Sequence, residues 1–145
     1  RFMNIYGPRQ DYLGAYVAII IKIIDRIQKN RAPVIYGDGS QSFDFVFVED
    51  ACRSLILAMT SSVTCDAYNI SSGQQISILD LCGKIQKIMK NNTPIEFINK
   101  DEKNYLVTNR IGSTQKAKDE LGFEVYMPLE DGLKKVIDWK LKQHS

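Results

Sequence analysis

The polar and aromatic side chains best placed for chemistry lie within residues 35–51, which read IYGDGSQSFDFVFVEDA. Tyr36 precedes Gly37-Asp38-Gly39, and two glycines around an aspartate predict a tight turn with positive φ. The turn leads into Phe43–Val48, whose alternating side chains predict an extended strand. An aromatic ring and polar backbone at the mouth of a buried strand are typical of a small-molecule site.

Both faces of this strand carry apolar side chains, because phenylalanines at 43, 45 and 47 alternate with valines at 46 and 48. A strand of this kind is covered on both sides, as in an α/β protein. Asp44 lies within the strand, and we interpret it as a structural residue that binds neighbouring backbone. Asp50 is expected to cap the helix that follows.

Composition argues against several other kinds of site. The only histidine among 145 residues is His144, so we expect neither a histidine-based catalytic triad nor a metal site. Cys52, Cys65 and Cys82 lack C-x-x-C spacing, which indicates reduced thiols in a cytoplasmic protein. A net charge of +2 indicates no nucleic-acid partner. The apolar run 15–21 is far shorter than the roughly 20 residues of a membrane span.

Helices and strands alternate along the chain, which predicts an α/β fold in one domain covering residues 1–145. Strands are predicted at 1–6, 34–36, 43–48, 67–70 and 95–98, and helices at 14–30, 50–59, 77–90, 113–121 and 128–143. Arg1 already lies in a strand signal, so we expect the sequence to be the C-terminal piece of a longer protein.

Spacing and end signals support the individual helices. The first helix is expected to bury one face, formed by Tyr16, Ile20, Ile23, Ile24 and Ile27. A second set of residues marks helix ends: Ser77 with Asp80 predicts a capping box, Ser113 an N-cap, and Gly122 a C-terminal stop.

Five motifs, in this order, resemble a known family. They are RFMNIYGPRQ at 1–10, GAYVAII at 14–20, IYGDGSQSFDFVFVEDA at 35–51, YNISSGQQISI at 68–78 and IGSTQKAKDELGF at 111–123. As a set they resemble the NAD-dependent nucleotide-sugar epimerases and dehydratases, which are extended short-chain dehydrogenase/reductases, and UDP-glucose 4-epimerases in particular. The resemblance covers nearly the whole chain but only the C-terminal, substrate-binding portion of such a Rossmann-type enzyme, without its Gly-rich dinucleotide-binding half.

The resemblance implies a division of labour. In the family, NAD takes a hydride from a sugar carbon while the tyrosine of a Tyr-x-x-x-Lys motif takes the hydroxyl proton. None of the tyrosines of this chain has a lysine four residues later. We therefore expect no catalytic residue here, and an isolated chain that is inactive. Its expected role is to hold the nucleoside diphosphate, so that binding energy far from the reacting carbon positions that carbon.

Binding residues follow from the resemblance as well. It implies that Asn4 reaches the diphosphate or sugar and that Val34 and Tyr36 contact the base. Many family members bind the diphosphate through an arginine where this chain has Phe43, so we expect another cation, Arg110 or secondarily Lys103, to replace it. Each residue also has a plainer interpretation: Asn4 as a backbone partner, Tyr36 as a half-buried aromatic, and the two cations as solvated surface charges.

Several alternatives stay open. The implied enzyme is most similar to a UDP-sugar 4-epimerase, but a dTDP- or GDP-sugar 4,6-dehydratase, a UDP-glucuronate decarboxylase or a non-catalytic sugar-nucleotide-binding module fits the same residues. The expected partners are a nucleotide sugar, an N-terminal Rossmann domain of the same protein and a second copy in a homodimer. If the chain stands alone, open strand edges at 1–6 and 67–70 predict self-association.

Overall fold

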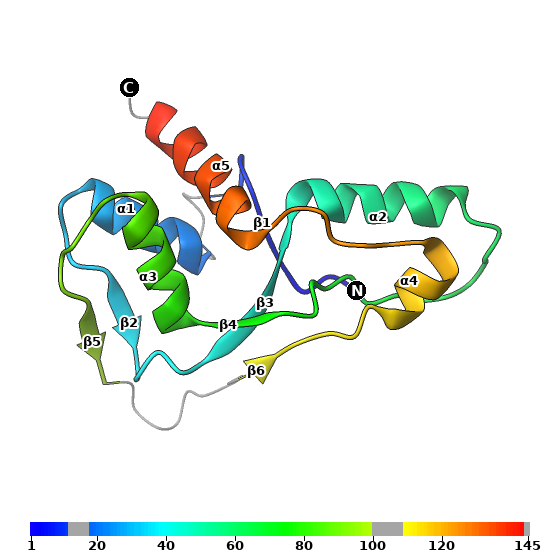
Figure 1. Cartoon of the computed structure of the whole chain (residues 1–145), viewed down its shortest axis with the longest axis horizontal. Coiled ribbons are helices and arrows are strands. Elements are labelled where there is room, and N and C mark those ends of the chain that lie inside the picture. Colours follow the sequence, from blue (N-terminus) through cyan, green and yellow to red (C-terminus); the bar gives the residue numbers. More distant parts are fainter. Residues whose placement is uncertain (12–17, 100–108, 144–145) are drawn as a thin grey trace.

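A computed structural model describes residues 1–11, 18–99 and 109–143. Its elements alternate as the sequence predicts (Figure 1). The strands are β1 (Asn4–Tyr6), β2 (Val34–Tyr36), β3 (Ser42–Phe47), β4 (Gln75–Ser77), β5 (Glu96–Ile98) and β6 (Asn109–Arg110). The helices are α1 (Ile19–Gln28), α2 (Val48–Thr60), α3 (Ile78–Ile88), α4 (Gln115–Leu121) and α5 (Leu129–Lys142).

Strand β3 is the centre of the larger sheet. Its second half forms a parallel pair with β1. Its first half forms an antiparallel pair with β4 and a parallel pair with β6. Strands β2 and β5 form a separate parallel pair, which lies beyond the start of β3 in Figure 1. The fold is therefore an α/β fold with mainly parallel strand pairs, as predicted.

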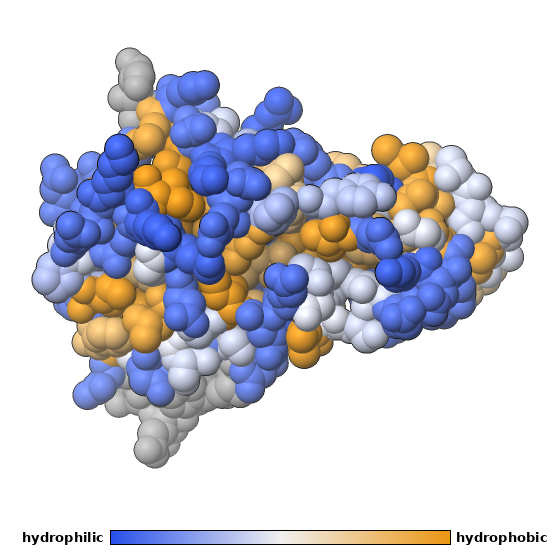
Figure 2. Space-filling view, viewed as in Figure 1, coloured by the Kyte–Doolittle hydropathy of each residue, from blue (hydrophilic) through white to orange (hydrophobic). Residues whose placement is uncertain are grey.

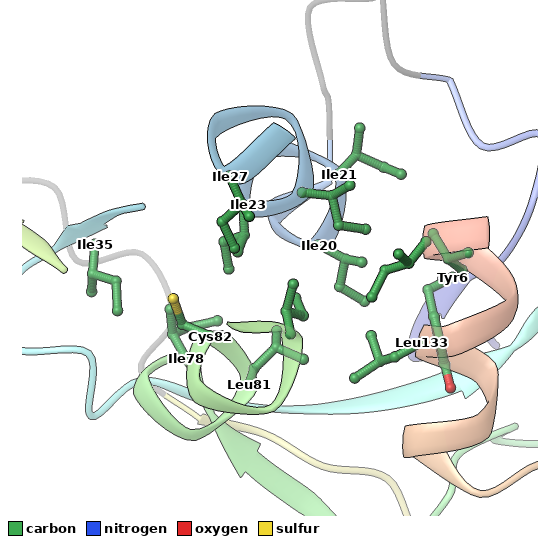
Figure 3. Close-up of a cluster of buried hydrophobic side chains, with 14 of the residues drawn as sticks. Tyr6, Ile20, Ile21, Ile23, Ile27, Ile35, Ile78, Leu81, Cys82 and Leu133 are labelled. Atoms are coloured by element: carbon green, nitrogen blue, oxygen red, sulfur yellow. The ribbon is translucent and has the colours of Figure 1, made fainter. Parts of the chain in front are cut away.

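The two faces of β3 look into two apolar clusters, which confirms that the strand is covered on both sides. Phe47 lies in the larger cluster with Tyr6, α1, α3 and α5, and Phe43 and Phe45 pack against it. Figure 3 shows this cluster between α1, α3 and the α5 residue Leu133. Val46, on the other face, is fully buried in a smaller cluster with Ile70, Ala117 and Phe123.

Helix α1 is anchored by its isoleucines. The predicted inward residues Ile20, Ile23, Ile24 and Ile27 are all buried, and Ile21 joins them. β-branched side chains are moderate helix formers, so packing stabilises this helix more than propensity does. The described helix begins at Ile19 rather than near residue 14; Tyr16 and the rest of 12–17 lie outside the described residues.

The strand predictions were wrong for three segments in which only one to three residues pair with another strand. The segment 67–70 is not a strand: it contributes a single parallel bridge, between Phe2 and Ile70. Conversely, β4 and β6 were not predicted. They contain three and two residues, too few for a period-two pattern to be visible in the sequence.

The prediction that Asp50 caps a helix is wrong. Helix α2 begins at Val48, so Asp50 already lies in its first turn and makes no capping bond. Its buried carboxylate instead accepts hydrogen bonds from the backbone nitrogens of Tyr126 (3.2 Å) and Met127 (3.0 Å), and pairs with Arg53 at 3.0 Å. Asp50 therefore joins α2 to the segment between α4 and α5.

Two of the other three predicted helix ends are confirmed. The Ser77 hydroxyl accepts a hydrogen bond from the backbone nitrogen of Asp80 at 3.0 Å, which confirms this cap of α3. Gly122 ends α4 with a left-handed φ of 66°, as predicted. Ser113 is not the N-cap of α4: Thr114 holds that position, without a side-chain capping bond.

Candidate functional site

Arg110 lies beside Phe43 on the neighbouring strand. In the β3–β6 register, Phe43 pairs with Arg110 and Ser42 with Asn109. Paired residues of parallel strands point their side chains to the same face, and neighbouring strands run about 5 Å apart. The structure thus places the backbone of Arg110 beside Phe43, with both side chains on the same face of the sheet.

Arg110 is exposed, and its guanidinium makes no ion pair with any residue in the described ranges. A guanidinium is planar, permanently charged and able to donate to two oxygens of a phosphate at once. This geometry suits an anion such as a diphosphate.

Asn4 also lies against β3. Its side-chain nitrogen donates a hydrogen bond to the backbone oxygen of Asp44 at 3.0 Å, and the side chain is half-buried. This bond is the backbone role that the plainer interpretation assigned to Asn4. The amide nitrogen has a second N–H, so one donor and the side-chain oxygen remain for a ligand. Asn4 is paired with Phe45 and Arg110 with Phe43, so both residues lie along one short stretch of β3.

Val34 and Tyr36 belong to the other sheet, on β2. Val34 is half-buried, and Tyr36 is 53% exposed, so the Tyr36 ring is a surface feature rather than part of the core. The turn that follows has the predicted positive φ at Gly37 (77°) and Gly39 (79°). Hydrogen bonds from Ser40 close this turn and lower the pKa of Asp38. This turn connects β2 to the start of β3, where Arg110 is paired, and Lys103 lies outside the described residues.

Asp44 is fully buried and, as predicted, structural. Its carboxylate accepts hydrogen bonds from the backbone nitrogens of Ser72 (2.7 Å) and Gly73 (2.8 Å) and from the hydroxyls of Ser71 (2.5 Å) and Ser72 (2.8 Å). These bonds compensate for burying a charge, which is costly when the group has no partner. They fasten the turn after Ile70 to β3.

The sequence did not predict these serine partners. The sequence feature that could have predicted them is the Ser-Ser-Gly turn, because backbone nitrogens and hydroxyls in such a turn can converge on a buried carboxylate. Ser42 was missed as well: its hydroxyl donates to the side-chain oxygen of Asn109 at 2.6 Å and so holds β6.

A groove of about 1280 Å³ borders β3, because Phe45, the register partner of Asn4, is among its lining residues. It runs between α3, β4 and the segment that links α4 to α5, and it is lined by both positively charged lysines and negatively charged carboxylates. None of Asn4, Val34, Tyr36 or Arg110 lines this groove. The predicted binding residues thus stay predictions, gathered around β3 and β2 rather than in this groove.

Other classes of site find little support in the described part of the chain. No group of histidine, cysteine, aspartate and glutamate side chains there could hold a metal ion. The thiols of Cys52 and Cys65 are exposed and free, and burial raises the pKa of the Cys82 thiol to about 11. Each helix of the described ranges is too short or too polar to cross a bilayer.

Comparison with known proteins identifies the relatives of this fold. The NAD dependent epimerase/dehydratase family matches residues 1–71. A UDP-N-acetyl-alpha-D-glucosaminuronate decarboxylase of Bacillus cytotoxicus is 31% identical over 96% of this chain and 44% of its own length. The human dTDP-D-glucose 4,6-dehydratase is 29% identical over 96% of this chain and 40% of its own.

A solved structure agrees with these sequence matches. The UDP-glucose 4-epimerase of Thermotoga maritima, crystallised with UDP-glucose, superposes with a TM-score of 0.91 at 28% identity. It covers 100% of this chain, which corresponds to 46% of the epimerase. The chain therefore spans less than half the length of these relatives, and its sequence and fold are similar to those of NAD-dependent epimerases and dehydratases.

Proposed function

We propose that this chain binds the nucleoside diphosphate of a nucleotide sugar, as the substrate-binding portion of an NAD-dependent epimerase similar to UDP-sugar 4-epimerases. The observation that carries the proposal is the register of β3 and β6, which puts Arg110 directly beside Phe43. At that position many family members carry the arginine that binds the diphosphate. A cation on the next strand, on the same face, replaces the missing charge with little change in location.

The remaining binding roles are proposals of the same kind. Asn4 bonds Asp44 through one N–H of its amide, so the second N–H and the side-chain oxygen are available close to β3. Tyr36 offers an exposed ring to the base, and a base stacked on an aromatic ring gains about 1–3 kcal/mol. Val34 flanks the base from the same strand, and Lys103 is a second candidate cation.

The residues of this chain do not fit NAD by themselves. A dinucleotide-binding loop joins a strand to a helix, whose N-terminus receives the pyrophosphate. Gly37 and Gly39 instead form a turn between two strands, β2 and β3. Tyr-x-x-x-Lys is also missing from the 145 residues. We therefore derive no chemical step from these residues: NAD binding and catalysis are proposed for an N-terminal Rossmann domain, and the chain alone is expected to be inactive.

Two further candidate reactions are suggested by the relatives themselves. One is a decarboxylase of a UDP-sugar acid and another a dTDP-glucose 4,6-dehydratase, and both match this chain as well as epimerases do. Binding the diphosphate is common to all three reactions, so the residues proposed here serve each of them. The choice among reactions depends on groups near the sugar carbons.

Isothermal titration with UDP and dTDP tests the proposed site, in the longest natural polypeptide that contains these residues. Replacing Arg110 with alanine should weaken UDP binding about tenfold or more, since a hydrogen bond between charged groups contributes about 1.5–3 kcal/mol. Lys142→Ala, an exposed charge at the end of α5, is the matched control and should leave the affinity unchanged. Equal affinity of wild type and Arg110→Ala would remove Arg110 from the site.

A further inference from the structure

The segment that carries Arg110 is attached to β3 on both sides. Before Arg110, the Ser42 hydroxyl donates to the side chain of Asn109 at 2.6 Å. After it, the single proton of the Ser71 hydroxyl is shared between two acceptors, the backbone oxygen of Gly112 at 2.6 Å and the Asp44 carboxylate at 2.5 Å. Ser42 and Asp44 are the two neighbours of Phe43 in the sequence. Both attachments therefore originate next to the residue that Arg110 pairs with.

Side-chain bonds matter here because the strand pairing is minimal. Strand β6 contains two residues, and ladders of that length are weak. Asn109 and Arg110 are exposed, so apolar packing does little to hold them. The position of the guanidinium thus depends on the bonds that flank it.

The attachment through Ser71 is rigid. Ser71 is fully buried, and the turn that carries it is bound to Asp44 through the backbone nitrogens of Ser72 and Gly73. Gly112 approaches it closely because it has no side chain: a Cβ there would lie 3.0 Å from the Cβ of Ser71 and 3.3 Å from Met3. A backbone oxygen held this tightly fixes the chain two residues after Arg110.

We propose that Ser71, oriented by Asp44, is a positioning residue for Arg110: its hydroxyl fixes the backbone at Gly112 and so keeps the guanidinium beside Phe43, where it binds the diphosphate. Ser42 does the same from the other side, through Asn109. This inference rests on the proposed function. It assigns substrate affinity to a buried serine that lies in a different segment from every predicted contact residue.

A double-mutant cycle with UDP as the probe tests the proposal. Ser71→Ala is measured by isothermal titration in wild-type and Arg110→Ala backgrounds. We expect it to weaken UDP binding about three- to tenfold when Arg110 is present and less than about twofold when it is absent, because residues that act through one another are not additive. The salt dependence of UDP binding should also flatten in Ser71→Ala, as it does in Arg110→Ala, since both lose a phosphate contact.

Ser54→Ala is the matched control. Ser54 is also a buried serine, 2% exposed, whose hydroxyl donates to the Ala51 oxygen within α2 at 2.7 Å. It should lower stability without changing UDP affinity. If Ser71→Ala does not fold, Ser42→Ala removes the other attachment at a half-buried position and should give the same Arg110-dependent loss.

The outcomes separate this inference from the proposed function. Loss of affinity in Arg110→Ala but not in Ser71→Ala or Ser42→Ala overturns the positioning role alone. An equal loss from Ser71→Ala in both backgrounds also overturns it, since the serine then acts independently of Arg110. A wild-type protein that does not bind UDP overturns the proposed function, and the positioning role with it.

Discussion

Gly132 of α5 lies against the ring of Tyr6 with no room for a side chain. A Cβ built there would be 2.2 Å from the Tyr6 hydroxyl oxygen and 3.0 Å from the Phe47 ring. Tyr6 cannot easily move away, because it is buried and its hydroxyl donates to the Leu129 oxygen at 3.3 Å. Burial and the nearby carboxylates of Asp50 and Asp131 also raise its pKa.

Replacing Gly132 with alanine should therefore destabilise the protein by about 1–3 kcal/mol, the usual cost of overpacking a core. Urea unfolding monitored by circular dichroism measures the change. The matched control is Gly83→Ala in α3, where a Cβ meets nothing within 4 Å. That variant should gain up to about 1 kcal/mol, because alanine is the better helix former. Loss of stability in both variants would contradict the steric argument.

At the scale of single residues, the sequence predicted roles more readily than partners. Asp44 was recognisable as structural because a lone carboxylate in an apolar strand must be compensated. Its partners lie 27 to 29 residues further on, in a turn whose own composition suits many neighbours. Arg110 was a candidate only through resemblance, and its pairing with Phe43 depends on a strand that no local pattern marks.

Helix α2 is joined to the far end of the chain by Asp50. The carboxylate accepts hydrogen bonds from Tyr126 and Met127 while it pairs with Arg53, whose guanidinium lies 3.7 Å over the ring of Tyr126. Arg53 also donates to the Glu124 backbone oxygen. One helical turn of α2 thus holds the connection between α4 and α5 in place.

Asp50→Ala should lower the free energy of unfolding by about 1.5–3 kcal/mol, since it leaves these donors without their charged acceptor. Glu49→Ala is the matched control: Glu49 is exposed and pairs only with Lys135 among the described residues, at 3.2 Å. An exposed pair contributes less than about 1 kcal/mol. Chemical denaturation compares the two, and equal losses would show that Asp50 acts as an ordinary surface charge.

Among the elements, long periodic segments could be predicted and short ones could not. The isoleucine spacing of α1 and the alternation of β3 identify a helix and a strand covered on both faces. Strands β4 and β6 form because their backbones pair with β3. Pairing of this kind depends on the tertiary structure, so it produces no recognisable pattern in the sequence of such short segments. The prediction that Asp50 is an N-cap was wrong because α2 begins at Val48, two residues earlier.

The whole molecule presents apolar surface on α2. Leu55 is 52% exposed, Ile56 60% and Met59 84%, and Figure 2 shows apolar atoms among those that cover this helix. Strand β1 pairs with β3 along one edge, and no second strand pairs with it in the described part of the chain. Such faces and edges favour association, so the prediction of self-association retains its physical basis.

Sedimentation velocity over a concentration series measures this association in the 145-residue chain. We expect sedimentation coefficients that rise with concentration, and a shift toward the monomer when Ile56 and Met59 are replaced by lysine. Leu79→Lys, on α3 and 41% exposed, is the control and should leave the association unchanged. A wild-type chain that remains monomeric at all concentrations would contradict the prediction.

Strand β3 takes its partners from opposite ends of the sequence. The Asn4 side chain bonds across 40 residues to Asp44, and Asn109 is bonded to Ser42 across 67. During synthesis, therefore, β3 leaves the ribosome long before β4 and β6 exist, with one half paired and the other open. Pairings so distant in sequence form slowly and leave apolar surface exposed meanwhile. The half of β3 that pairs with β6 therefore stays open until residue 110 has emerged, and only then can the predicted phosphate-binding arginine reach its place.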